Sequence, residues 1–247
     1  MTSFVYGTIM ATFISLGVYS LNAAIAQNET SINATSLFGS GQMILPNNVK
    51  HLVILIPNEG HHGPGEEDES RFIAQPFVPQ NVMVGPGTQV IWYNGDVGHE
   101  HNIVVSDNNG NQIFQTAEFT ELVASRPITF NNTGNFQYAD TVEYEEGFVM
   151  TGNVTVVNQN NGAASRTVGT YDTVGTLMVP SPFVQSAVES MRSAGFVIDS
   201  IHAFTDLRGG QEDTGEEQVL VVWTAAGKSM DEIVLQLGEV SEGLSYE

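Results

Sequence analysis

A series of short β-type runs, each closed by turn residues, places the strongest constraint on how this chain folds. The runs cover residues 51–56, 80–84, 89–93, 102–105, 126–130, 135–138 and 153–157. They end at turns rich in Gly, Pro, Asn and Asp, such as residues 85–87, 94–96 and 107–110. Strands at this spacing are typical of a β-sandwich. We therefore predict an all-β sandwich domain over residues 50–157.

The pattern changes after a polar, glycine-containing stretch at residues 158–165, which we interpret as a linker. Beyond it the apolar period becomes about 3.6 residues, which indicates helices. One predicted helix starts near Ser181 and ends at Gly195, and a second follows a Ser229-x-x-Glu232 capping box. Predicted strands cover residues 176–179, 196–204 and 218–225. The order β-α-β-β-α predicts a small α+β domain at 166–247, of the split β-α-β type.

Composition excludes several classes of chemistry. The chain of 247 residues has no cysteine, 28 acidic residues and 7 Lys or Arg residues, with a formal charge of −21. Without cysteine there is no disulfide, thiolate zinc site, iron–sulfur cluster or cysteine nucleophile. Nucleic acids and anionic membranes need clustered basic side chains, so neither is an expected partner. The chemistry must rest on His, carboxylate, Met or hydroxyl groups.

The N-terminal stretch indicates export. Residues 4–26 are almost wholly apolar or small, and no charged side chain precedes Glu29. Ala24-Ile25-Ala26 has the A-x-A pattern of a signal-peptidase site, and the stretch is also long enough to span a bilayer. We therefore expect residues 1–26 to be a signal peptide or, if uncleaved, a membrane anchor, with a Ser/Thr/Asn-rich linker at 27–49. N-x-S/T triplets that predict a glycoprotein begin at Asn28, Asn33, Asn131 and Asn153.

Histidines cluster in the predicted sandwich. Five of the six lie between residues 51 and 101. His99 and His101 directly precede a predicted strand, and alternate residues of an extended chain face the same side. Two imidazoles placed in this way can bind one metal ion, and imidazole suits copper, zinc and nickel. The alternative is a purely structural histidine pair.

An ordered series of motifs runs through residues 72–157. It comprises Phe77-Val78-Pro79, then Val84, Gly87, Val90, Trp92 and Asn94, then residues 101–105, then Gly134, Phe136 and Tyr138, and finally Met150, Gly152, Val154 and Val156. This series resembles the plastocyanin-type cupredoxins. The resemblance implies a Greek-key β-sandwich with one copper ion at one end. It also implies that His101 is the first histidine ligand and Met150 the axial thioether, although a lone Met is more often a core residue.

The sequence departs from that family at the ligand loop. The place of the family's cysteine falls on Asp140, and Glu143 stands where the loop histidine is expected. Without a thiolate there is no strong sulfur-to-copper charge transfer, so we predict a protein that is not intensely blue. Imidazole, carboxylate and thioether ligands favour ordinary Cu(II), or tolerate Zn(II). The lost thiolate also argues against fast one-electron transfer.

A long loop before the resembling region offers further ligands. His61 and His62 lie between Gly60 and Gly63 and precede the acidic run 66–69. One reading is a solvated loop, and the other is a flap that adds an imidazole to the site of His99 and His101. Adjacent side chains usually point apart, so we expect at most one of the two to bind the metal.

These observations support two functional hypotheses. The first is an exported, cupredoxin-like protein that binds one copper ion and serves electron transfer or copper carriage and storage. Its partner would be a redox or copper-delivery protein, and the acidic charge favours one with a basic surface. The second is a metal-free adhesion or assembly protein that retains the sandwich. A third hypothesis, a copper-dependent oxidase or reductase, has little support because the chain shows only one plausible site, so we expect no enzymatic activity.

Overall fold

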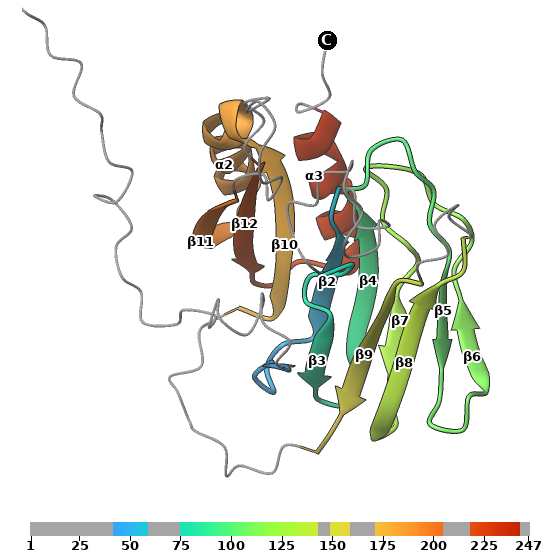
Figure 1. Cartoon of the computed structure of the whole chain (residues 1–247). Coiled ribbons are helices and arrows are strands. Elements are labelled where there is room, and N and C mark those ends of the chain that lie inside the picture. Colours follow the sequence, from blue (N-terminus) through green and yellow to red (C-terminus); the bar gives the residue numbers. More distant parts are fainter. Residues whose placement is uncertain (1–41, 59–74, 143–148, 159–170, 205–217, 243–247) are drawn as a thin grey trace, which may run out of the picture.

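The computed structural model describes residues 42–58, 75–142, 149–158, 171–204 and 218–242, which form two six-stranded sheets (Figure 1). The first sheet has the order β1-β3-β9-β8-β5-β6. Its strands are β1 (Met43–Ile44), β3 (Asn81–Val84), β5 (Ile103–Ser106), β6 (Gln112–Gln115), β8 (Gly134–Asp140) and β9 (Thr151–Val156). The predicted sandwich strands of this sheet are confirmed to within about two residues, while the short β1 and the polar β6 were not predicted.

The second sheet has the order β11-β12-β10-β2-β4-β7. Its strands are β2 (His51–Ile56), β4 (Thr88–Asn94), β7 (Ile128–Phe130), β10 (Thr173–Pro180), β11 (Val197–Phe204) and β12 (Gln218–Ala225). The chain crosses repeatedly between the two sheets from β1 to β9, as in a Greek-key sandwich. The prediction of an all-β sandwich followed by α+β elements is therefore confirmed.

Two α-helices accompany the second sheet. The short 3-10 helix η2 (Ser181–Phe183) leads into α2 (Val184–Ser193), and α3 (Met230–Glu242) is the last described element. Gly195 follows α2 with φ of +86°, a left-handed conformation that glycine adopts without strain. The capping box is confirmed, since Glu232 accepts the Ser229 N–H at 2.8 Å while the Glu232 N–H donates to Ser229 Oγ at 3.3 Å.

Strands from both predicted domains share the second sheet. β10 pairs in parallel with β2 through Thr173–His51 and Val174–Leu52, so β10, β12 and β11 continue the sheet of the sandwich (Figure 1). β10 and β11 are each antiparallel to β12, which lies between them, and α2 connects them. This is the predicted split β-α-β arrangement. Buried side chains of both regions form one continuous core.

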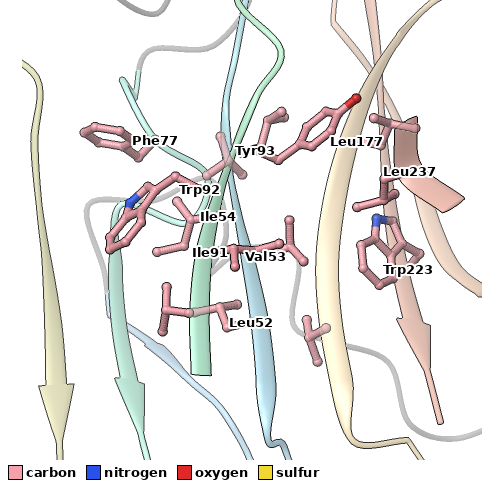
Figure 2. Close-up of a cluster of buried hydrophobic side chains, with 14 of the residues drawn as sticks. Leu52, Val53, Ile54, Phe77, Ile91, Trp92, Tyr93, Leu177, Trp223 and Leu237 are labelled. Atoms are coloured by element: carbon pink, nitrogen blue, oxygen red, sulfur yellow. The ribbon is translucent and has the colours of Figure 1, made fainter. Parts of the chain in front are cut away.

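The central strands of the second sheet are buried on both faces. In β4, Trp92 contacts the Tyr138 ring of the opposite sheet at 5.3 Å between centroids, whereas the neighbouring Tyr93 hydroxyl is hydrogen-bonded to Ser241 of α3. Figure 2 shows Trp92 and Phe77 on one side of the sheet, with Tyr93, Leu177, Leu237 and Trp223 on the other. The sandwich interior therefore covers one face and the C-terminal elements cover the other.

The ring of Trp223 in β12 packs directly against the backbone of Gly175 in β10. Gly175 pairs with Trp223, and a Cβ atom at Gly175 would lie 2.2 Å from Cζ2 of the Trp223 ring. The indole also packs edge-on against Phe196 at 4.8 Å between centroids. Only glycine leaves room for the indole at this position.

No helix among the described residues has the length and apolar character needed to span a membrane, and the predicted signal or anchor at 1–26 lies outside them.

Candidate metal centre

The site lies at one end of the sandwich, where four strands begin or end. Asp140 is the last residue of β8, and Met150 directly precedes β9. His101 comes two residues before β5, and the loop of residues 95–101 follows β4. The Asp140 N–H donates to the Met150 carbonyl at 3.0 Å, and Ile103 of β5 pairs with Asp140. The pairing of β5, β8 and β9 therefore brings the predicted ligands His101, Asp140 and Met150 to the same end.

His101 is fully buried, and both its backbone and its imidazole have hydrogen-bonding or charged partners. Its N–H donates to the Phe119 carbonyl at 3.1 Å, and the Phe119 N–H returns a bond of 3.0 Å to the His101 carbonyl. On the imidazole, Nδ1 lies 2.5 Å from Oδ2 of Asp140 and Nε2 lies 3.4 Å from Oδ2 of Asp96. The ring therefore stands between two buried carboxylates.

Asp140 is fixed by the backbone around it. Its Oδ1 accepts the N–H groups of Asn102 at 3.0 Å and Val142 at 3.1 Å, which leaves Oδ2 directed at His101. Only 4% of the residue surface is exposed. Burial opposes ionisation of this carboxyl, but the His101 hydrogen bond and charge, together with the backbone N–H groups, outweigh it and lower the pKa of Asp140.

The same balance acts on the histidine. Burial by itself lowers the pKa of His101, but hydrogen bonds to Asp140 and Asp96 and the charges of both carboxylates prevail, so that its pKa lies above 6.5. The cluster of Asp96, His101 and Asp140 therefore favours positive charge on the imidazole. A neutral ring would leave a nitrogen lone pair directed at a carboxylate on one side.

The other predicted ligands occupy different positions. Met150 is fully buried beside Asp140. The side chain of His99 is 39% exposed, with Nδ1 at 3.2 Å from the Val97 carbonyl and 3.6 Å from Oδ1 of Asp96, so its ring stands nearer the surface than that of His101. The predicted ligands His61, His62 and Glu143 lie outside the described residues. The structure thus brings the His101 and Asp140 side chains together, with the Met150 backbone beside Asp140.

The donor atoms of His101, Asp140 and Met150 are of kinds that copper binds. Imidazole nitrogen, carboxylate oxygen and thioether sulfur all bind copper, and zinc also accepts the first two. Their spacing is that of a proton-bridged pair, because two donors bound to one metal at about 2 Å each stand about 2.8 Å apart or more. Metal binding therefore requires Asp140 and His101 to separate by a few tenths of an ångström. Within the described residues, no group of three His, Asp or Glu side chains is arranged to hold a metal ion.

Sequence reasoning missed Asp96 and the part played by Asn94. Both side chains are buried, and the Asp96 N–H donates to Oδ1 of Asn94 at 2.8 Å. The Asn94 amide donates to the carbonyls of His99 at 2.9 Å and Phe119 at 3.3 Å. Asn94-Gly95-Asp96 has the composition of an ordinary surface turn. No local pattern distinguishes a buried aspartate there from a solvated one.

Several solved structures, cupredoxins among them, are similar to part of the chain. The chain is similar to a purple cupredoxin from Nitrosopumilus maritimus, with 26% identity and a TM-score of 0.34 over 43% of this chain and 99% of the other. It is similar to auracyanin from Roseiflexus castenholzii, with 17% identity and a TM-score of 0.31 over 44% and 98%. For a copper-containing nitrite reductase from Thermus scotoductus the identity is 20% and the TM-score 0.30, over 44% of this chain and 28% of that one.

No protein-family model and no curated protein matches the chain. The class is defined by the architecture itself: two mixed sheets facing one another, with a buried His–Asp pair where β5 and β8 meet at one end. The described strands form a cupredoxin-like β-sandwich. It continues directly into the split β-α-β unit through β10.

Proposed function

We propose that this chain is an exported, cupredoxin-like protein that binds one copper ion, as Cu(II), without a thiolate. His101, Asp140 and Met150 would hold the ion, with His99, Glu143 and one of His61 or His62 as further ligands. The observation that carries the proposal is the buried imidazole between two carboxylates, with Nδ1 2.5 Å from Asp140 Oδ2. At this spacing the two atoms share a proton, and a metal ion would replace that proton only after the two side chains separate by a few tenths of an ångström.

The donor set favours copper carriage over fast electron transfer. A thiolate ligand stabilises both oxidation states of copper in similar geometry, and the chain has no cysteine. Carboxylate oxygen is a harder donor that favours Cu(II) over Cu(I). The chemistry supplied by this chain would therefore be retention of Cu(II) at a buried site between carboxylates. The charge of −21 favours a delivery partner with a basic surface.

Metal analysis of the full chain tests the proposal. The protein, purified without chelators and dialysed against Cu(II), is expected to hold about one ion per chain, with EPR hyperfine splitting of the ordinary kind and weak visible absorption. Voltammetry separates the two roles, because a reversible one-electron wave would indicate electron transfer. A chain that stays empty after dialysis would overturn the proposal.

Two substitutions at one position locate the ion. Asp140→Cys returns a thiolate to the place that the cupredoxin resemblance assigns to cysteine, and with Cu(II) it is expected to produce an intense visible band. Asp140→Asn, of nearly the same shape, is expected to weaken Cu(II) binding without colour. Asp107→Asn, in the turn between β5 and β6, is the matched control and should bind as the wild type does. A colourless Cu(II) complex of Asp140→Cys would move the ion away from Asp140.

One observation favours the second candidate, a metal-free adhesion or assembly protein. The 2.5 Å distance between His101 and Asp140 is shorter than a metal-bridged pair allows and suits a shared proton. In this case the His–Asp pair would hold the strand ends together in place of a metal ion. Unchanged thermal stability with and without Cu(II) would support this candidate, since binding to the folded state alone raises the melting temperature.

A further inference from the structure

The outer face of the first sheet carries no charged side chain on its described strands. Burial alternates along β3, β5, β8 and β9, so that every second side chain of these strands lies on this face. The side chains placed there, including those of β1 and β6, are Asn, Gln, Ser, Thr, Ala, Val, Met and Ile. On a typical soluble protein about a quarter to a third of the surface residues are charged. This face is therefore a neutral area on a chain whose formal charge is −21.

The middle of this face is a row of amides and one hydroxyl, which we call the amide row. It crosses five neighbouring strands. Asn153 of β9 pairs with Asn81 on one side and with Gln137 of β8 on the other. Gln137 pairs with Ser106, which pairs with Gln112 of β6. The Asn153 amide donates to Asn81 Oδ1 at 2.9 Å. Every side chain of the amide row can both donate and accept hydrogen bonds.

Apolar side chains flank the amide row on the same face. Ile44 and Met83 pair on one side of it, and Val104 and Ala139 pair on the other. Ile44 is 62% exposed. The described helices α2 and α3 lie on the side of the second sheet, so neither covers this face (Figure 1). Apolar groups mixed with neutral polar groups, and a depletion of charge, are typical of the centre of a protein–protein interface.

We propose that this face binds the same face of a second copy of the chain, so that two copies form a symmetric dimer. Two chains of charge −21 repel one another, and contact is opposed least where neither surface is charged. A two-fold contact also requires a surface that complements itself. Amides and hydroxyls meet this requirement because each of them donates and accepts, whereas a charged patch repels its own copy. The inference does not depend on copper.

The size of the face predicts a weak dimer. Six strands spaced about 4.8 Å apart, with about five residues along each at about 3.3 Å, give a face of about 25 by 16 Å. This is well below the roughly 800 Å² per partner that is standard for stable complexes. We therefore expect monomer and dimer to exchange, with the dimer favoured at high protein concentration.

Gln137→Glu tests the proposal at the centre of the face. Gln137 is exposed, and the substitution keeps its shape while it adds one negative charge. A two-fold contact brings both copies of this charge together, so the dissociation constant of the dimer should rise by a factor on the order of 10 or more. Gln185→Glu adds the same charge at an exposed site of α2, on the side of the second sheet, and should associate as the wild type does.

Equilibrium sedimentation of the full chain at increasing protein concentration measures the association. The protein is made in cells that add no N-glycans, because Asn153, with its N-x-T triplet, lies on this face. Association through the apolar residues 4–26 would be equal in all variants, so the comparison between variants isolates the face. Equal dissociation constants for the wild type and Gln137→Glu would overturn the proposal, as would a wild type that stays monomeric.

Gln137→Lys separates contact at this face from a general effect of net charge. Two lysines repel one another across the two-fold axis, so this variant should also associate more weakly than the wild type although its chain is less acidic. An equimolar mixture with Gln137→Glu should associate more strongly than either variant alone. If Gln137→Lys associates more strongly than the wild type, the contact lies elsewhere and the proposal fails.

The salt dependence gives a readout that needs no variant. Salt screens the repulsion between two acidic chains, so the wild-type dimer should become stronger as the ionic strength rises. A dimer that weakens with salt would indicate contact between oppositely charged surfaces, which contradicts a neutral face.

Discussion

The loop end of the sandwich and the C-terminal side of the second sheet are both buried, but by different means. At the loop end, Asn94, Asp96, His101 and Asp140 satisfy one another through directed hydrogen bonds and charges. On the C-terminal side, Trp223 and its neighbours fill volume with apolar groups. Hydrogen-bonded polar side chains are sensitive to a change of chemical type, because a partner is then left unpaired. Packed apolar side chains are sensitive to a change of size, because a cavity or a clash results. Substitutions of each kind should therefore separate the two regions.

The largest effect is expected from Trp223→Ala in the apolar region. The indole is fully buried between Gly175 and Phe196, and truncation leaves a cavity, so the free energy of unfolding should fall by about 3–5 kcal/mol. Because both regions share a sheet and a core, denaturant unfolding followed by circular dichroism should remain one transition shifted as a whole.

Val197→Ala, on the exposed edge strand β11, is the matched control and should change stability little, since this side chain is 60% exposed. Two separate transitions in Trp223→Ala, with only one of them shifted, would show that residues 166–247 fold as an independent domain.

A somewhat smaller loss is expected from His101→Leu at the polar end. The change removes the positive partner of two buried carboxylates, and breaking a buried pair in this way costs about 3 kcal/mol. Adding Asp140→Asn to His101→Leu should recover part of the loss, because one uncompensated charge is then absent. Chemical denaturation of the two variants checks this, and equal stability of single and double variants would argue against electrostatic coupling.

The His101–Asp140 pair should make the stability of the protein depend on pH. The pKa of His101 is raised, so its contribution is present below pH 6.5 and is lost as the pH rises through the folded-state pKa. The pKa of Asp140 is lowered, so its contribution is present above pH 3.8 and is lost as the pH falls through the folded-state pKa. The melting temperature of the wild type relative to Asp140→Asn should therefore be highest between pH 3.8 and 6.5. A constant difference from pH 3 to 9 would contradict this.

The smallest effect is expected where α3 meets β4. Tyr93→Phe removes the hydroxyl that is hydrogen-bonded to Ser241 and should cost about 1 kcal/mol. Burial also raises the pKa of Tyr93 to about 12, so the phenol remains protonated at neutral pH. A double-mutant cycle with Ser241→Ala, measured by urea unfolding, isolates the bond. Additive losses in the cycle would mean that the two hydroxyls do not interact.

The strands could be predicted from the sequence by local alternation, and the spacing of family motifs placed His101 and Asp140 at the same end of the sandwich. Their direct hydrogen bond was not predicted, because the resemblance implied a copper ion between them. The covering of the second sheet's outer face could not be predicted, since it depends on pairing between β2 and β10, about 120 residues apart in the chain. A signal was nevertheless present: the near-continuous apolar run of residues 52–56 is what a strand buried on both faces requires. A half-solvated sandwich strand would alternate instead.

Asp96 shows the opposite case, in which no signal exists. The local sequence Asn94-Gly95-Asp96 does not reveal whether the aspartate is buried or solvated. Its burial depends on how segments distant in the chain pack around it. Burial of Asp96 follows from Asn94, whose amide reaches Phe119, 25 residues further along the chain. Contacts of this kind lie beyond pattern reasoning because they depend on where two loops meet.

The pairing of β10 with β2 has a practical consequence for anyone who would shorten this protein. A fragment ending near Val157 would turn β2 into an open edge strand, with unpaired backbone groups beside an apolar face that α3 no longer covers. Exposed edges of this kind recruit other chains and promote aggregation. The C-terminal elements therefore protect this edge and this face from other chains. A sandwich without them is expected to aggregate.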